Sequence, residues 1–306
     1  QFKKVRMDTL LNSSGLAIDF ETTEWKPAQI TNEDKSLGVE ELIEKYGLNN
    51  SLSSLTKNEL LDKVENAKDS TRNERIITAT LCDVNKGDYI VISTLPLSES
   101  IDVKFPGKDI IINPELYHEK DQLALIEKVN EIIKEKQPFY MFGHKHTDFD
   151  YRIAHKLTGK FEIGVNGEKP EYHWGLPNRF MQVRVAPGRI DIEPSSYYQH
   201  YSWIRNNKLD TVFEDIVGMV DKKAFNHGEL EEAIRSIESS KRLSKEKKEL
   251  ADNINSYAMR DSIKSYIICS SLLKEILETS YLFGSTPIRV CTTSKKTLTE
   301  EYWTEK

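Results

Sequence analysis

Segments with the pattern of β-strands alternate with segments with the pattern of α-helices along this chain of 306 residues. Four short apolar runs, each bounded by polar or turn-forming residues, are typical of strands. Because helical patterns lie between and after these runs, their order predicts an α/β domain with a mixed sheet. The expected strands are Leu16–Phe20 and residues 75–84, 89–94 and 138–142, the middle two forming a hairpin around the turn 85–88.

Amphipathic spacing predicts the helices. Asp121 is placed to cap a helix whose apolar residues keep helical spacing to Lys136. Residues 244–283 contain neither Gly nor Pro and predict one long helix. Residues 161–193 instead alternate and turn, and the dipeptide Asn166–Gly167 predicts a β-hairpin there. The other expected helices are 150–157, opened by Asp148 or Asp150, and then 208–218 and 228–237.

Residues 26–75 differ in character from the segments on either side. They contain two stretches with helical spacing, and Thr56 with Glu59 fits a capping box at the start of the second. We interpret this segment as a helical insertion. We expect a surface helical pair that covers a site or binds a partner.

Composition excludes several classes of protein. Lys+Arg number 43 and Asp+Glu 49, so the net charge of −6 excludes a strongly basic DNA-coating protein and leaves room only for local basic patches. Three scattered cysteines argue against a disulfide framework or a Cys-rich zinc site and favour a reducing compartment. No run of eighteen apolar residues is present, so we expect no membrane span. No signal peptide is visible, although a start at Gln1 leaves a processed terminus open, and we expect an intracellular location, cytoplasmic or nucleoid/nuclear.

Carboxylates that follow strand patterns are the candidates for chemistry. Asp19 and Glu21 are two residues apart on a strand and therefore face the same side. Asp150 lies just past the strand 138–142, and Tyr257 and Asp261 share one face of the long helix. Carboxylates gathered from separate elements are costly without a cation, and they suit Mg²⁺ or Mn²⁺ rather than zinc. The sequence therefore predicts a site for two such ions, which can clamp an in-line phosphoryl displacement.

Each of these motifs, taken alone, has a commoner explanation. A D-x-E pair at a strand end is usually solvated, a Y-x-x-x-D pair on a helix is usually a surface pair, and an Asp before a helix is usually a cap. Their order, spacing and structural context together favour the catalytic interpretation.

The ordered set resembles the 3′–5′ proofreading exonuclease domain of family B DNA polymerases, a DnaQ-like, ribonuclease H-like exonuclease. AIDFETT at 17–23 resembles its first motif, FGHKHTDFDY at 142–151 its second, and SYAMRDSIKSY at 256–266 its third. Three further stretches also resemble the family. Residues 188–198 resemble its connecting strand, residues 208–218 the helix that follows, and residues 281–303 its link to the polymerase palm.

The resemblance implies a fold and a division of the chain. The fold would be a ribonuclease H-like mixed sheet flanked by helices, with a helical insertion and a β-hairpin. A short extension, 1–13, would precede an exonuclease-like domain, 14–283, that carries the insertion 26–75. Residues 284–306 would form a C-terminal segment like the linker to a polymerase palm.

The resemblance also implies a role for each candidate residue. Asp19 would bridge two Mg²⁺ or Mn²⁺ ions, Glu21 and Asp261 would complete the tighter site, and Asp150 would hold the second ion through water. Tyr257 would orient the attacking water. The implied reaction is removal of 5′-nucleoside monophosphates from a DNA 3′ end, single-stranded or a frayed primer, by a free-standing enzyme or by the proofreading part of a polymerase.

The second motif departs from the family pattern, because Lys145 lies where the family usually has Asn that helps to hold the DNA. Phe149 and Tyr151 could stack on a terminal base, although core packing is the commoner role for Phe149. Trp174, Arg179 and Arg189 are weaker candidates for contact with DNA. The full set of expected nucleic-acid contacts is Lys145, His146, Phe149, Tyr151 and Arg184.

Two other functions remain open from the sequence. The family's palm motifs are missing, so the chain also fits a non-catalytic DNA-binding or scaffold subunit docked to a separate polymerase chain through residues 281–306. The cost of unneutralised carboxylates argues against that alternative. An RNA 3′ exonuclease would use the same chemistry, and no residue decides between RNA and DNA, although the resemblance favours DNA.

Overall fold

The computed structural model describes most of the chain, in two compact units. One unit comprises residues 1–21 and 76–306, and the other comprises residues 22–75. Each unit has a hydrophobic core of its own. The described residues are 7–23, 36–46, 53–65, 75–147, 149–173, 183–195, 197, 201, 203–221, 225, 227–238, 244–293 and 295–304.

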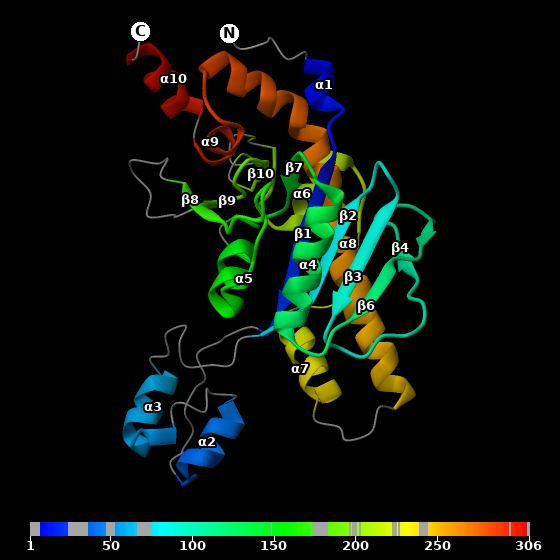
Figure 1. The fold of residues 1–306 in the computed structure, drawn as a ribbon, viewed down its shortest axis with the longest axis vertical. Helices are drawn as coiled ribbons and strands as arrows, with labels where there is room; N and C mark the ends of the chain where they lie inside the picture. The colour runs from blue at the N-terminus through cyan, green and yellow to red at the C-terminus, as the bar shows by residue number, and fades with distance from the viewer. Residues whose placement is uncertain are drawn as a thin grey trace. The chain divides into compact units, whose positions relative to one another are not determined.

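The larger unit is built on a six-stranded mixed sheet with the order β10-β7-β1-β2-β3-β6 (Figure 1). Parallel pairing joins β7 to both β1 and β10, and also β3 to β6, whereas β2 and β3 form the antiparallel hairpin that the sequence predicts. The strands are β1 Gly15–Thr22, β2 Ile76–Asp83, β3 Asp88–Ser93, β6 Glu115–His118, β7 Tyr140–Phe142 and β10 Ile190–Ile192.

Helices cover both faces of this sheet. One face packs against α4, Gln122–Lys136, and α5, Asp150–Thr158, in a single apolar cluster. The other face packs against the long helix α8, Lys245–Phe283, which crosses behind the strands in Figure 1. Shorter helices lie beside these layers and near the two ends of the chain. They are α1 Met7–Leu11, α6 Leu209–Val217, α7 His227–Glu238, α9 Pro287–Thr292 and α10 Lys295–Thr304.

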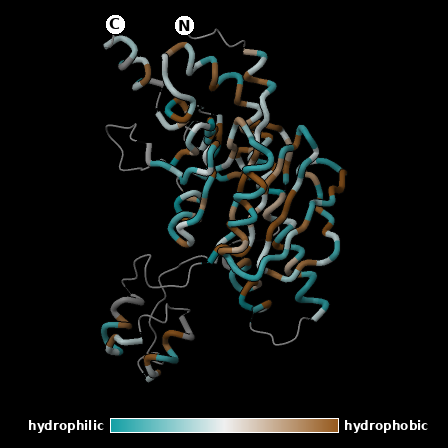
Figure 2. The backbone as a smooth tube through the Cα atoms, in the orientation of Figure 1, coloured by the Kyte–Doolittle hydropathy of each residue, from teal (hydrophilic) through white to brown (hydrophobic). Residues whose placement is uncertain are grey.

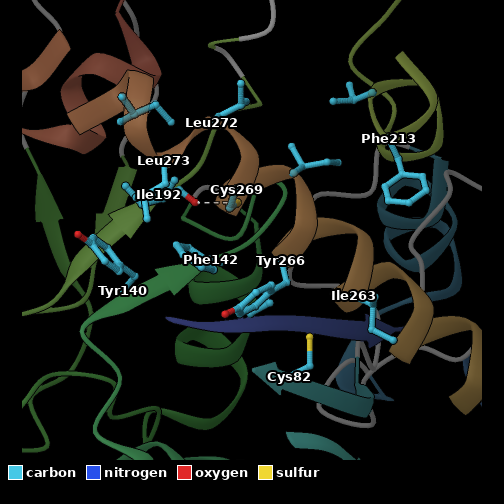
Figure 3. Packing of buried hydrophobic residues seen from close by; sticks show 14 of the residues in the cluster. Cys82, Tyr140, Phe142, Ile192, Phe213, Ile263, Tyr266, Cys269, Leu272 and Leu273 are labelled. Carbon is cyan, nitrogen blue, oxygen red and sulfur yellow. Dashed lines mark hydrogen bonds between the residues drawn. The ribbon is translucent and has the colours of Figure 1, made fainter. Parts of the chain in front are cut away.

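The apolar contacts between α8 and the sheet belong to the largest of the three core clusters found among the described residues of this unit (Figure 3). The ring of Tyr266 on α8 meets the ring of Phe142 on β7 edge to face, with centroids 5.2 Å apart. Further along α8, the Cys269 thiol donates to the backbone carbonyl of Ile192 on β10 over 3.4 Å. The C-terminal segment joins the same cluster, because Val290 of α9 and Leu298 of α10 are buried in it. These contacts fix α8 over the middle of the sheet.

Several predicted helix ends are confirmed. The Asp121 carboxylate accepts from the Ala124 N–H at 2.8 Å and caps α4. Ser244 caps α8, and Gly284 ends it in the left-handed conformation, which glycine adopts without steric cost. Hydrophobic and hydrophilic residues alternate along the flanking helices, as one-sided packing requires (Figure 2).

The segment 161–193 differs from its prediction. Asn166 and Gly167 form a tight turn, in which the Ile163 N–H donates to the Glu168 carbonyl, but strands do not flank that turn. The hairpin lies further along, where β8, Glu171–His173, pairs with β9, Val183–Val185. The strand β6 and the small pair β4, Val103–Lys104, and β5, Ile111–Ile112, were not predicted from the sequence, because these strands of two to four residues show no period-two alternation, whereas the equally short β7 lies in an apolar run of five residues, 138–142.

The smaller unit contains two helices, α2, Val39–Tyr46, and α3, Lys57–Glu65. Leu42 and Leu60 are completely buried in its core. The predicted capping box is present, because the Thr56 backbone N–H donates to the Glu59 carboxylate at 2.9 Å and the Glu59 N–H donates back to the Thr56 hydroxyl. In the described parts of both units, no helix combines the length and the apolar content needed to cross a membrane.

Candidate active site

The alternation of side chains along β1 decides where its two carboxylates point. Leu16, Ile18 and Phe20 belong to the cluster under α4 and α5, whereas Ala17 belongs to the cluster under α8. Because side chains two residues apart share a face, Asp19 and Glu21 lie on the α8 side of the sheet. The strand pattern of the sequence therefore aims both carboxylates at the long helix.

A seam of buried hydroxyl groups sets the rotation of α8 against β2. The Thr80 hydroxyl on β2 contacts the Ala258 carbonyl at 3.2 Å and the Ser262 hydroxyl at 2.7 Å. One turn earlier, the Thr78 hydroxyl donates to the Asn255 side chain at 2.8 Å. The α8 partners of these threonines lie within two residues of Tyr257 or Asp261, so the seam holds that face of α8 over the end of β1.

The structure brings together the five residues expected to carry the chemistry. The Tyr257 hydroxyl is hydrogen-bonded to the Asp261 carboxylate, and both Asp19 and Glu21 act electrostatically on Tyr257. Asp150, at the first turn of α5, is 3% exposed and accepts from the backbone N–H of Phe20. Elements far apart in the sequence, β1, α5 and α8, therefore contribute to one cluster.

The cluster carries more negative charge than its surroundings compensate. Burial, and then the charge of Asp261, raise the pKa of Asp19 to about 7, although Lys264 opposes the shift. Burial and the charge of Asp19 raise the pKa of Asp150 well above its ordinary value. Burial raises the pKa of Asp261 as well, against the opposing charge of Lys264. At neutral pH the cluster therefore takes up a proton or a cation.

Lys264 is a buried cation at the edge of this cluster that the sequence analysis did not single out. Its side chain is 1% exposed, and its Nζ lies 2.8 Å from Asp261, 2.6 Å from Asp210 and 2.9 Å from Asp221. Burial disfavours the charged ammonium, but Asp261 and Asp210 outweigh burial and raise the pKa of Lys264, so it stays protonated. Asp210 belongs to α6 and Asp221 to the loop after it, so their meeting with Lys264 depends on tertiary structure and has no local sequence signal.

The donor chemistry around Asp19 suits a hard divalent cation. Carboxylate oxygens are the preferred ligands of Mg²⁺ and Mn²⁺, and Asp19, Glu21 and Asp150 supply them beside uncompensated charge. Within the described ranges, no three Asp, Glu, His or Cys side chains already form a metal-binding group. At Asp261, the cation that the structure contains is the ammonium of Lys264.

The loop after β7 is held by two buried carboxylates of the β10 region. His146 Nε2 lies 3.3 Å from the Asp191 carboxylate, which also accepts from the Tyr151 hydroxyl at 2.9 Å. The Glu193 carboxylate accepts from the Thr147 backbone N–H at 2.9 Å. Asp191 and Glu193 repeat the two-residue spacing of Asp19 and Glu21, and this spacing was the signal that could have identified them in the sequence.

These contacts change the interpretation of three expected nucleic-acid contacts. His146 and Tyr151 are completely buried, so in this structure neither side chain reaches a ligand in solvent, and both support the loop from within. Arg184 is 8% exposed, and its backbone N–H donates to the Thr147 carbonyl at 3.0 Å. Arg189 is also buried, and its guanidinium donates to the Ile163 carbonyl at 2.7 Å.

Two of the expected contacts do have exposed side chains. Phe149, 39% exposed, and Lys145 lie in the segment between β7 and α5, directly before Asp150. Lys145 adopts the left-handed conformation, with φ of 69°. The expectations for Asp148, Trp174 and Arg179 fall outside the described residues.

Comparisons with known proteins bear on the fold alone. No protein-family model matches the chain, and no curated protein matches it in sequence. Among solved structures, it is similar to the family B DNA polymerase from the hyperthermophilic archaeon Pyrobaculum calidifontis, with a TM-score of 0.58 and 13% sequence identity. The match covers 92% of this chain and 27% of that polymerase chain. The likeness confirms the expected fold class, a ribonuclease H-like mixed sheet flanked by helices. In the polymerase, the matching region is one part of a much longer chain.

Proposed function

We propose that this chain is a metal-dependent 3′–5′ DNA exonuclease that releases 5′-nucleoside monophosphates. The observation that carries the proposal is the cluster formed by Asp19 and Glu21 from β1, Asp150 from α5, and Tyr257 with Asp261 from α8. The similarity in fold to part of a family B DNA polymerase supports a polymerase-related role. The cluster adds the chemistry that a shared fold by itself does not supply.

Each residue has a task that follows from its contacts. Asp19, Glu21 and Asp150 would hold a Mg²⁺ or Mn²⁺ ion, which when bound lowers the pKa of water and neutralises charge on the scissile phosphate. Asp261 fixes the Tyr257 hydroxyl by a hydrogen bond. The pKa of Tyr257 is raised, by burial first and by Asp261 next, so the phenol keeps the proton that it donates to Asp261, and its oxygen can accept a hydrogen bond from a water that enters the site.

The segment before α5 is the proposed grip on the DNA end. Lys145 can neutralise a phosphate, and the exposed ring of Phe149 can stack on a terminal base, which contributes about 1–3 kcal/mol per base. The net charge of −6 gives the molecule no general attraction for DNA, so affinity would depend on such local contacts.

The deciding experiment follows the degradation of single-stranded DNA labelled at the 5′ or the 3′ end, with Mg²⁺, Mn²⁺ or EDTA. A ladder that shortens from the 3′ end, requires the metal and disappears in Asp19→Ala would support the proposal. Asp102→Ala, which removes an exposed carboxylate next to β4, is the matched control and should keep full activity. Cleavage that survives in Asp19→Ala would contradict the assignment of the site. The same assay with a single-stranded RNA substrate shows whether the enzyme prefers DNA or RNA.

A non-catalytic scaffold role is the second candidate, and an exposed apolar surface favours it. Tyr281 and Leu282 at the end of α8 are 82% and 63% exposed, and Trp303 on α10 is 70% exposed. The ring of Tyr302 contacts Phe283, so the ends of the two helices lie together. A subunit docked through this surface would bind primer ends or a polymerase chain without cleaving DNA, and Trp303→Ala would weaken that association while leaving any hydrolysis intact.

A further inference from the structure

Lys264 donates hydrogen bonds to Asp210 and Asp261 and forms an ion pair with Asp221. An ammonium has three N–H donors, and three carboxylates lie within 2.6–2.9 Å of Nζ. The side chain is 1% exposed, and it leaves α8 on a buried face of the helix. Arg260 pairs with the other oxygen of Asp221 and completes this charged group.

The contact with Asp261 reduces what that carboxylate can offer a metal ion. One oxygen of Asp261 accepts from Lys264 at 2.8 Å, and the carboxylate also binds the Tyr257 hydroxyl. A divalent ion at Asp261 would lie close to a fixed positive charge in a partly buried setting, where repulsion between like charges is weakly screened. The Lys264 ammonium also lowers the pKa of Asp19 through its charge, but the carboxylates within ion-pair distance of it are Asp210, Asp221 and Asp261.

We propose that Lys264 supplies at Asp261 the positive charge that a second divalent ion would otherwise supply, so that this site binds one Mg²⁺ or Mn²⁺ ion instead of two. This inference rests on the proposed function, because it concerns the same carboxylates. It refines the expectation of two ions: Asp19, Glu21 and Asp150 hold the ion, and Asp261 with Lys264 forms the fixed, metal-free half of the site.

The test counts ions directly. Mn²⁺ binding to the full chain is measured by calorimetry and by electron paramagnetic resonance of the unbound ion, with no DNA present. The expected result is one ion per wild-type chain. In Lys264→Met, which keeps the length of the stem and removes the charge, a second ion should bind at least tenfold more tightly than in wild type.

The controls separate charge from folding. Lys274→Met removes an exposed lysine from the same helix and should leave one ion bound. Because Lys264→Met leaves the partly buried Asp210 and Asp261 carboxylates without this cation, Lys264→Met/Asp210→Asn is measured alongside it as the variant with less uncompensated charge. Either Lys264 variant, once shown to be folded by circular dichroism, is expected to gain the second ion.

The outcomes distinguish this inference from the proposed function. Two ions on wild type, or one ion on both wild type and the folded Lys264 variants, would overturn the role of Lys264 and leave a metal-dependent nuclease standing. No ion bound to wild type at millimolar Mn²⁺ would overturn both.

Discussion

At the scale of single residues, Asp19 makes the metal-free protein sensitive to pH. An ordinary Asp ionises near pH 4, whereas burial and the neighbouring Asp261 raise the pKa of Asp19 to about 7 in the fold. Between these values the folded chain binds more protons than the unfolded chain. The contribution of Asp19 to stability is therefore fully present below about pH 4 and is lost as the pH rises through about 7.

Asp19→Asn removes this titration. In EDTA at pH 8 we expect the variant to have a free energy of unfolding on the order of 2 kcal/mol higher than wild type, with the difference shrinking toward pH 5. Denaturant unfolding across this pH range measures it. Asp102→Asn, at an exposed position, should show no such trend. A difference between Asp19→Asn and wild type that does not grow from pH 5 to pH 8 in EDTA would contradict the assigned charge cluster.

Lys145 connects backbone conformation with the proposed grip on DNA. A side chain in the left-handed region costs about 1–2 kcal/mol, and Asn tolerates that region better than Lys. Lys145→Asn should therefore raise the free energy of unfolding by about 0.5–1 kcal/mol. The same change removes an exposed cation, so affinity for single-stranded DNA should fall. Thermal melting measures the change in stability, and titration with DNA measures the change in affinity. If stability and affinity both rose, or both fell, in Lys145→Asn, this interpretation would be contradicted.

At the scale of secondary-structure elements, the seam between α8 and β2 positions Asp261. Thr80→Val keeps the volume of the side chain and removes the hydroxyl that contacts Ala258 and Ser262, so we expect a loss of about 1–2 kcal/mol in stability. Because this seam orients Asp261 and Tyr257, metal-dependent cleavage should fall by up to about tenfold.

Thr94→Val is the matched control for the seam. The Thr94 hydroxyl also donates to a backbone carbonyl, that of Ile77, but among the described residues it forms no hydrogen bond with α8. We expect a similar loss of stability without a loss of cleavage at a temperature where both variants are folded. Equal cleavage by Thr80→Val and Thr94→Val would mean that the seam contributes to stability alone.

The elements that the sequence predicts well are those with long or strongly marked patterns. Residues 244–283 form one helix because nothing within them interrupts it, and Asp121 and Ser244 mark starts that the structure confirms. Asn166–Gly167 misled the prediction of the hairpin, because turn chemistry fixes a local bend and does not specify which strands pair. Pairing of β8 with β9 depends on contacts outside the turn.

At the scale of the whole molecule, the same division holds for the candidate site. Asp19, Glu21 and Tyr257 with Asp261 were accessible to sequence reasoning because spacing along one strand or one helix fixes a shared face. Lys264 with Asp210 and Asp221 was not, because three separate segments meet only after folding. Burial of His146 and Tyr151 was equally invisible, since it depends on Asp191 from a distant strand.

The two compact units predict that residues 24–74 can be removed without unfolding the rest. Where the chain leaves and re-enters the larger unit, the Thr23 N–H donates to the Arg75 carbonyl at 3.0 Å, and the Arg75 N–H donates to the Thr23 hydroxyl at 3.0 Å. The two ends are therefore close enough to be joined by an Asn-Gly turn, which favours a two-residue hairpin. All the proposed metal ligands belong to the larger unit.

We expect the shortened chain to fold cooperatively and to bind Mn²⁺ with the stoichiometry of the full chain, as measured by thermal melting and calorimetry. A change in DNA cleavage, with metal binding preserved, would assign the smaller unit to the substrate, because only the path of DNA to an intact site would have changed. If neither cleavage nor DNA binding changes, our expectation that the insertion covers the site is refuted. The remaining expectation is then that the insertion binds a partner. Loss of folding would show that the larger unit needs residues 24–74 in order to fold.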